Sequence, residues 1–249
     1  MTLLLAAHGS RDPRFAHTAG RIADRVAERL PEVDVRLAFL DLNTPTVAEA
    51  LPTLTGSVTV VPLLLSDAFH ARVDLPAIIS AAQQRNPDLD VVQTAPLGAD
   101  LRLAGAAADR LRQAGLRPGD GIICAAVGST DPSNNAAAFR HAQQLADLLG
   151  EHPVRTVCCT DVGRRDERLQ AAVTELRNAG ARRFIVSPFM IASGLLSDRL
   201  ERFLDEHTPG YAVAGPLGAH ARLVDVITER HRQTSATSDA RNTVTESVG

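Results

Sequence analysis

The sequence predicts an α/β protein of two similar lobes, each a mainly parallel four-stranded sheet with helices on both faces. Two observations support this fold class. Short apolar segments alternate with segments of helical periodicity along the 249 residues, an order typical of parallel strands joined by crossover helices. Short motifs also repeat: AHGSRDP at 7–13 returns as AVGSTDP at 126–132, and PLGA at 96–99 returns at 216–219. A repeat of this length is near the size of a common domain.

The first lobe is expected to begin with Thr2–Ala7, a continuous apolar run typical of a strand buried on both faces. Residues 14–30 follow with apolar side chains at helical spacing. Thr44 and Pro45 are expected to supply the N-cap and first position of a helix. Along the whole first lobe we expect strands near 2–7, 33–40, 57–65 and 89–95. Helices near 14–30, 44–54, 74–85 and 99–114 are expected to follow them in alternation.

The second lobe repeats this scheme. Its strands are expected near 121–127, 154–160, 183–191 and 211–215, and its helices near 133–149, 165–179, 195–206 and 219–232. The repeat therefore divides the chain into a first lobe at 1–116 and a second at 117–233. Residues 234–249 have no apolar period and are rich in polar side chains, so we expect them to form a disordered tail.

Composition excludes several classes of function. The net charge of −3 and the lack of a basic run argue against nucleic-acid binding. No apolar stretch is long enough to span a membrane, and the apolar run at the N-terminus stops at His8, which favours a core strand over a signal peptide. The three cysteines form no CxxC pair and are expected to be buried and reduced. We expect a cytoplasmic protein.

Polar residues follow three successive strands of the first lobe. His8 comes after the first strand, Asp41 after the second, and His70 in the loop after the third. Ligands of open parallel sheets bind outside the carboxyl ends of the strands, so these three side chains are expected to converge. Two imidazoles and a carboxylate suit a borderline divalent metal.

Other interpretations of these residues are weaker. A single histidine after a strand is more often structural than catalytic. Neither a P-loop nor a GxSxG elbow is present, so neither Ser10 nor Ser129 is expected to be a nucleophile. The remaining histidines fall mostly on predicted helices or their ends, and we expect them at the surface: His17, His141, His152, His207, His220 and His231.

Together, the AHGSRDP, AFLDLNTP, VPLLLSDAFHARVDLP and PLG segments resemble the type II (class II) tetrapyrrole chelatases, the family often called CbiX or SirB. The resemblance covers roughly residues 2–232. It implies insertion of Co²⁺ or Fe²⁺ into sirohydrochlorin, toward cobalamin or siroheme, and some members handle nickel (Ni²⁺). The divalent metal is a substrate, and no organic cofactor is implied.

The resemblance places His8 and His70 on the family's metal-binding and catalytic histidines. Asp41 falls where many members have Glu, and residues 66–69 replace a glycine-rich stretch. We expect Asp41 to orient an imidazole or relay a proton. Arg11 and its neighbour Ser10, together with Arg72, are candidates for contacts to the carboxylates of the tetrapyrrole.

Only the first repeat keeps the histidines, because Val127 replaces His8 and 194–196 replace the segment of His70. We therefore expect a monomer with one active site in a cleft between lobes. A protein that binds metal or tetrapyrrole without turnover is the main alternative. An unrelated flavodoxin-like enzyme would need a phosphate-binding loop, which the sequence lacks.

Overall fold

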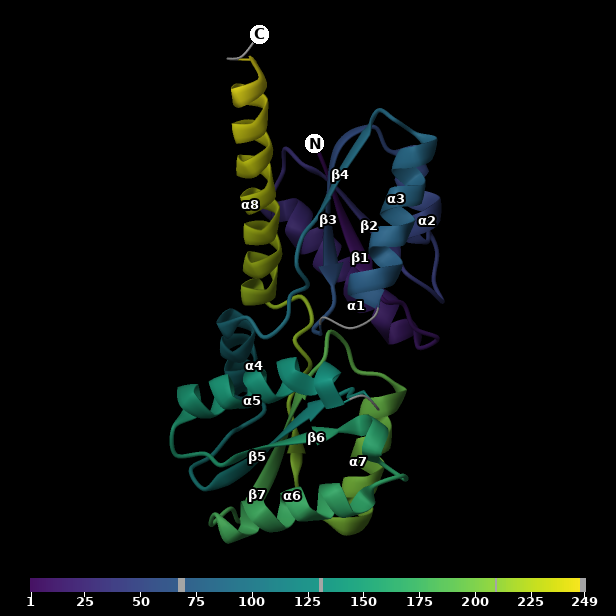
Figure 1. Cartoon of the computed structure of the whole chain (residues 1–249). Coiled ribbons are helices and arrows are strands. Elements are labelled where there is room, and N and C mark those ends of the chain that lie inside the picture. Colours follow the sequence, from purple (N-terminus) through teal and green to yellow (C-terminus); the bar gives the residue numbers. More distant parts are fainter. Residues whose placement is uncertain (67–69, 130–131, 209, 247–249) are drawn as a thin grey trace.

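The computed structural model describes residues 1–66, 70–129, 132–208 and 210–246, with side chains described except at 70–71, 132–133 and from 235 onward. It has two α/β lobes, one above the other in Figure 1. Each contains a four-stranded parallel sheet, which confirms the predicted fold class. Among the described residues, no helix combines the length and the hydrophobicity that a membrane-spanning helix requires.

The first sheet has the order β2-β1-β3-β4. Its strands are β1 (Thr2–Ala7), β2 (Asp34–Phe39), β3 (Gly56–Leu63) and β4 (Leu89–Gln93). Ala7 is in register with Phe39 and with Leu63, so three strands end at one edge of the sheet. The helical elements of this half are α1 (Pro13–Arg29), α2 (Val47–Ala50), η1 (Leu51–Thr53), η2 (His70–Asp74), α3 (Leu75–Arg85) and α4 (Leu101–Gln113).

The second sheet repeats this arrangement in the order β6-β5-β7-β8. Its strands are β5 (Asp120–Ala126), β6 (Val154–Cys158), β7 (Arg183–Phe189) and β8 (Ala212–Val213). Ala126 is in register with Cys158 and Phe189, the counterpart of the first sheet's edge. The helical elements are η3 (Pro132–Asn135), α5 (Ala136–Leu149), η4 (Cys159–Asp161), α6 (Asp166–Asn178), α7 (Leu195–His207) and α8 (Ala221–Glu246).

The last helix of each repeat packs on the other repeat's sheet. Helix α4 packs against α5 and β7, whereas α8 packs against α1 and β3. The hydroxyls of Thr59 in β3 and Thr234 in α8 lie 3.2 Å apart, within hydrogen-bond distance. Figure 1 shows α8 beside the upper lobe and α4 beside α5. One core of buried side chains therefore runs through both lobes and includes the apolar faces of both exchanged helices.

Two expectations about helices differ from the structure. The second helix starts after Thr46 and not at Thr44, because Thr46 and Glu49 form a capping box. The Glu49 N–H donates to Thr46 Oγ1 at 3.2 Å, and the Thr46 N–H donates to the Glu49 carboxylate at 2.8 Å. The backbone of α8 also continues to Glu246, where we expected no regular structure from 234. That stretch contains no glycine or proline to end a helix.

Candidate functional site

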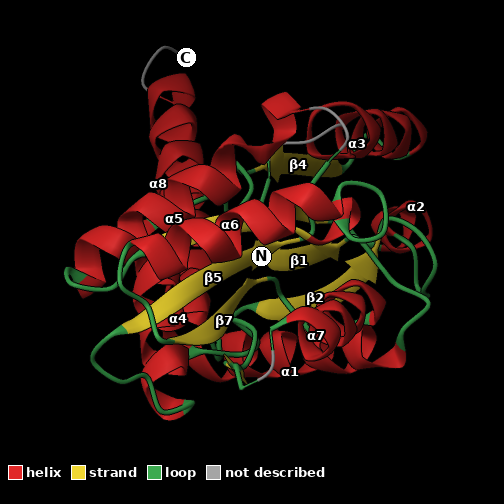
Figure 2. Ribbon diagram, turned by 90° about the horizontal axis from the view of Figure 1, so that it is seen from below, coloured by secondary structure: helices red, strands yellow, loops and turns green. Residues whose placement is uncertain are grey.

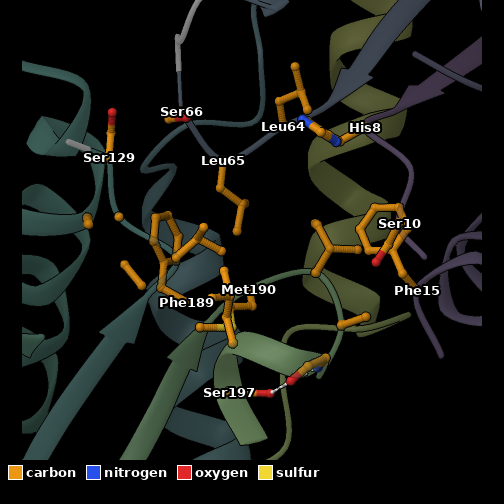
Figure 3. A pocket seen from close by; sticks show the side chains of 18 of the residues that line it. His8, Ser10, Phe15, Leu64, Leu65, Ser66, Ser129, Phe189, Met190 and Ser197 are labelled. Atoms are coloured by element: carbon orange, nitrogen blue, oxygen red, sulfur yellow. Dashed lines mark hydrogen bonds between the residues drawn. The ribbon is translucent and has the colours of Figure 1, made fainter. Parts of the chain in front are cut away.

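A cavity of about 830 Å³ lies between the lobes, at the carboxyl ends of β1, β3, β5 and β7. This volume is within the usual range for small-molecule sites. The first lobe contributes residues 8–11, Phe15, Leu42 and 63–66, and the second contributes 126–129, parts of η3 and α5, and 189–197. Figure 3 shows His8 and Leu64 on one side of the cavity and Phe189 and Met190 on another. Most of the described lining is apolar, and its polar residues are His8, Arg11 and a few serines and asparagines.

The turn that carries His8 depends on Gly9. Its φ of +94° is in the left-handed region, and a Cβ added there would lie 1.7 Å from the Asp41 carbonyl oxygen. The two segments are hydrogen-bonded: the Asp41 N–H donates to the His8 carbonyl at 3.0 Å, and the Ser10 N–H donates to Asn43 Oδ1 at 2.7 Å. The loops after β1 and β2 therefore form one hydrogen-bonded rim.

His8 is half-buried and lines the cavity. Its Nδ1 lies 3.1 Å from the Gly9 carbonyl oxygen. Because a carbonyl oxygen only accepts, the tautomer that makes this bond carries its proton on Nδ1 and its lone pair on Nε2. A ring fixed in this way can ligate a metal or accept a proton through Nε2.

The other predicted site residues are placed unequally. Ser10 and Arg11 line the same cavity as His8, and Arg11 is exposed. Asp41 contacts the His8–Gly9 turn through its backbone. Its side chain is exposed, and the carboxylate accepts a hydrogen bond from the Leu42 N–H at 2.7 Å. Asp41 is not part of the cavity lining. Arg72, exposed in η2, is also outside that lining.

His70 is the first residue of the π-helix η2, four positions after Ser66 of the cavity lining. Its side chain and residues 67–69 lie outside the described part of the structure, so the predicted convergence of His8 and His70 stays a prediction. Among the described side chains, no group of three or more His, Cys, Asp or Glu could hold a metal ion.

The second lobe supplies an apolar wall. Val127, in the position of His8, is exposed and lines the cavity with Phe189 and Met190. The Gly194 N–H donates to Ser197 Oγ at 2.9 Å and starts α7, which brings Leu195 to the cavity. The repeats in the sequence had located this wall only at Val127 and 194–196. The register of the repeats could have found the rest, since Leu63 and Phe189 occupy equivalent strand ends.

Two residues of the first lobe were not anticipated at the site. Leu42 lines the cavity with a left-handed backbone, φ 65°, which is uncommon for a residue with a branched side chain. Phe15, in the first turn of α1, lines it from beside the AHGSRDP turn. Phe15 lies two residues after the AHGSRDP segment and Leu42 directly follows Asp41, so proximity to the predicted site residues was the available signal.

The prediction that the remaining histidines are at the surface was wrong for His141 and His231, which are 0% and 3% exposed. The His141 ring stacks on Phe189 of the cavity wall with a centroid distance of 4.0 Å. Neither of its ring nitrogens has a hydrogen-bond partner among the described residues. Burial lowers the pKa of His141 to about 4, so the ring is neutral near pH 7.

A family model described as CbiX matches residues 2–114 and 121–234, one segment in each repeat. The chain belongs to the CbiX family. This CbiX protein is 25% identical over 249 residues to the sirohydrochlorin ferrochelatase of Bacillus subtilis (strain 168), a match that covers 96% of this chain and 94% of the relative. It is 24% identical over 243 residues to a sirohydrochlorin cobaltochelatase of Priestia megaterium, covering 92% and 78%.

The fold of this CbiX protein is similar to a solved structure, SirB from Bacillus subtilis with Fe³⁺. The TM-score is 0.80 at 23% sequence identity, with 96% of this chain and 97% of the other covered. At that identity the likeness concerns the fold alone. The chain therefore has the fold of SirB, and the cavity described above lies between the two lobes of this chain.

Proposed function

We propose that this protein inserts a divalent metal, Co²⁺ or Fe²⁺, into sirohydrochlorin, in the biosynthesis of cobalamin or siroheme. The observation that supports this proposal most strongly is the position of His8. Its oriented imidazole lies at the edge of a largely apolar cavity between the two lobes of a CbiX-family chain. Relatives named as ferrochelatase and as cobaltochelatase match along most of the chain. Metal and tetrapyrrole are both substrates here.

Metal insertion needs a group that presents the metal and a base that takes the inner N–H protons of the ring. His8 can do either through Nε2, because its Nδ1 is bonded to the Gly9 carbonyl. We assign the second imidazole to His70, on the basis of its position after β3. A pair of ligands also suits delivery, since a closed four-ligand cage would retain the metal.

The apolar lining fits the flat face of a tetrapyrrole, and the rim fits its carboxylates. Arg11 and Ser10 line the cavity where its first-lobe edge meets solvent, and a guanidinium binds a carboxylate through two parallel hydrogen bonds. Arg72 is a further candidate for this contact. We assign to Asp41 the orientation of the His8 imidazole, through the backbone hydrogen bond of the shared turn, since its carboxylate accepts from the Leu42 N–H.

We also propose that one chain is sufficient for activity, because both walls of the cavity belong to the same chain. We further propose that the protein acts as a monomer in the cytoplasm. The reducing cytoplasm is consistent with three cysteines that are all free.

An anaerobic absorbance assay tests the proposed function. Sirohydrochlorin is mixed with a catalytic amount of protein and Co²⁺, Fe²⁺ or Ni²⁺ in separate reactions. We expect the absorbance of the free ring to convert to that of the metallated ring over many turnovers, at a rate proportional to protein concentration. Initial rates with the three metals rank the substrates, since divalent affinities alone follow a general series.

The alternative function, binding of tetrapyrrole or metal without turnover, predicts a different result in the same assay. Sirohydrochlorin would bind in a stoichiometric amount, and adding metal would produce no conversion beyond the rate without protein. That outcome would replace the enzymatic proposal with a role in carrying or delivering the ligand.

A further inference from the structure

Three side chains join the two lobes beside the cavity: Asp12, Arg14 and Asp198, here called the Arg14 cluster. Arg14 Nε and Nη2 donate to the Asp12 carboxylate at 3.0 and 2.6 Å. Arg14 Nη1 and Nη2 donate to the Asp198 carboxylate at 3.1 and 2.6 Å. Asp12 is the N-cap of α1 in the first lobe, and Asp198 lies in the first turn of α7 in the second. One guanidinium therefore binds a carboxylate from each lobe.

The Arg14 cluster lies where two cavity-lining segments approach each other. Residues 8–11 precede Asp12, and residues 189–197 precede Asp198. A Cβ added to Gly194 would lie 3.8 Å from Asp12 Oδ2, which shows how close the two lobes are at this point. The cluster thus joins the two lobes beside the cavity without lining it.

The connections along the chain are on another side of the molecule. The lobes are linked through α4 and α8, whose exchange holds them together. In Figure 1, and in the view from below in Figure 2, α4, α5 and α8 lie on the left and α7 lies to their right. If the lobes open to admit a macrocycle, the side held by the Arg14 cluster can separate, whereas the side with the exchanged helices acts as the hinge.

We propose that Arg14 is a positioning residue that holds the two lobes around the bound macrocycle by its contact with Asp198. The inference rests on the proposed function for the identity of the macrocycle. Breaking the Arg14–Asp198 contact favours the open arrangement, so a bound tetrapyrrole leaves faster. The catalytic groups themselves are untouched.

The size of the effect follows from the exposure of the pair. Arg14 and Asp198 are 46% and 36% exposed, so solvent screens the interaction. The fork geometry places it at the strong end of such pairs, and an exposed pair shifts an equilibrium by at most about fivefold. Arg14 therefore biases the lobes toward closure and does not lock them.

A second pair on the same helix is a matched control. Arg29, the last residue of α1, contacts Asp225 of α8 at 2.6 Å, the same distance as Arg14 to Asp198. Its exposure is similar, 52% and 44% for the two side chains. Both α1 and α8 pack on the first sheet, and neither Arg29 nor Asp225 is part of the cavity lining. Losing this pair removes an ion pair without separating the lobes.

The first experiment measures dissociation of sirohydrochlorin, without metal, by stopped-flow absorbance. We expect Arg14→Ala and Asp198→Asn each to raise the rate about threefold to fivefold. The double variant should match Arg14→Ala, because Asp198 has no contact left to lose once the guanidinium is gone. Asp198→Glu should restore the parent rate, and Arg29→Ala should not change it. A slower rate in Asp198→Asn would overturn the proposal, since it would mean that the freed guanidinium binds the ring instead.

The second experiment needs no tetrapyrrole and so separates this proposal from the proposed function. Spin labels at Arg21→Cys on α1 and Arg202→Cys on α7, both exposed, report the distance between lobes in a Cys158→Ser background. We expect Arg14→Ala and Asp198→Asn to broaden the distribution toward longer distances, and Arg29→Ala to leave it unchanged. Identical distributions in all four proteins would overturn the role of Arg14, even if metal insertion is confirmed. Failure of every protein to bind sirohydrochlorin would instead count against the proposed function.

Discussion

Gly9 shows how one residue sets the geometry of the rim. Its left-handed φ and the Asp41 carbonyl leave no room for a Cβ. Gly9→Ala is therefore expected to lower the free energy of unfolding by about 3 kcal/mol or more, or to displace the loop after β2. Gly20, in α1, is the control, because a Cβ there meets no atom within 4 Å. Gly20→Ala should be neutral or stabilising by up to about 1 kcal/mol. Urea denaturation measures both, and equal effects would contradict this account.

His141 makes the stability depend on pH. Its folded pKa of about 4 is below the value of an unfolded histidine, so the folded state disfavours the protonated ring. The stabilising contribution is complete above about pH 6.5 and is lost as the pH falls toward 4. We expect His141 to account for about 2 kcal/mol of lost stability at pH 5 relative to pH 8.

A His141→Phe variant isolates this contribution from other acid-sensitive groups. Burial also lowers the pKa values of His220 and His231, and these groups titrate in the same direction. Urea unfolding at pH 8 and pH 5 should therefore show a smaller loss in the variant than in the parent protein. If the two proteins lose the same stability, His141 is not the buried neutral group described here.

At the residue scale, the sequence located the first-lobe rim because His8, Gly9 and Ser10 directly follow a buried strand. It missed the burial of His141, although Ala138, Ala142 and Leu145 surround that histidine on the apolar stripe of α5. The helical spacing could have revealed it. The orientation of the Asp41 carboxylate could not be predicted, because a hydrogen bond to the next backbone N–H depends on local loop geometry.

At the element scale, the strands and the buried helix faces follow from apolar periodicity. The exchange of α4 and α8 does not follow from this periodicity. Each helix has an apolar face, and the sequence pattern alone does not indicate which of the two sheets that face covers. Which sheet it covers is decided by the connections that lead into it and by the shape of the shared core. The start of α2 also depends on local structure. The hydrogen bonds of the capping box make Thr46, rather than Thr44, the N-cap residue.

The exchange predicts that a change in the second repeat destabilises the first sheet. Ile227 is fully buried in α8, in the core shared by both lobes. Ile227→Ala should cost about 2–5 kcal/mol and lower the hydrogen-exchange protection of β1 and β3. Leu204→Ala in α7 is the control, since Leu204 is equally buried but packs within the second lobe. Loss of protection in β1 and β3 with Leu204→Ala alone would contradict the packing.

At the scale of the whole molecule, duplication has produced two walls with different chemistry. The first lobe brings an imidazole to the cavity where the second brings Val127. One macrocycle and one metal per chain are therefore expected. A titration of the protein with sirohydrochlorin, followed by absorbance, should end at one equivalent. Two equivalent sites would show that the second lobe is not merely a wall.

The rate of metal insertion by a His8→Ala variant shows directly whether His8 takes part in the reaction. His17 is the control, as an exposed histidine on α1 of the same lobe that is not part of the cavity lining. With Co²⁺ and sirohydrochlorin, His8→Ala is predicted to insert metal at least about 100-fold more slowly than the parent protein, and His17→Ala at the parent rate. If His8→Ala inserts metal as fast as the parent, His8 has no role in the reaction and the site lies elsewhere.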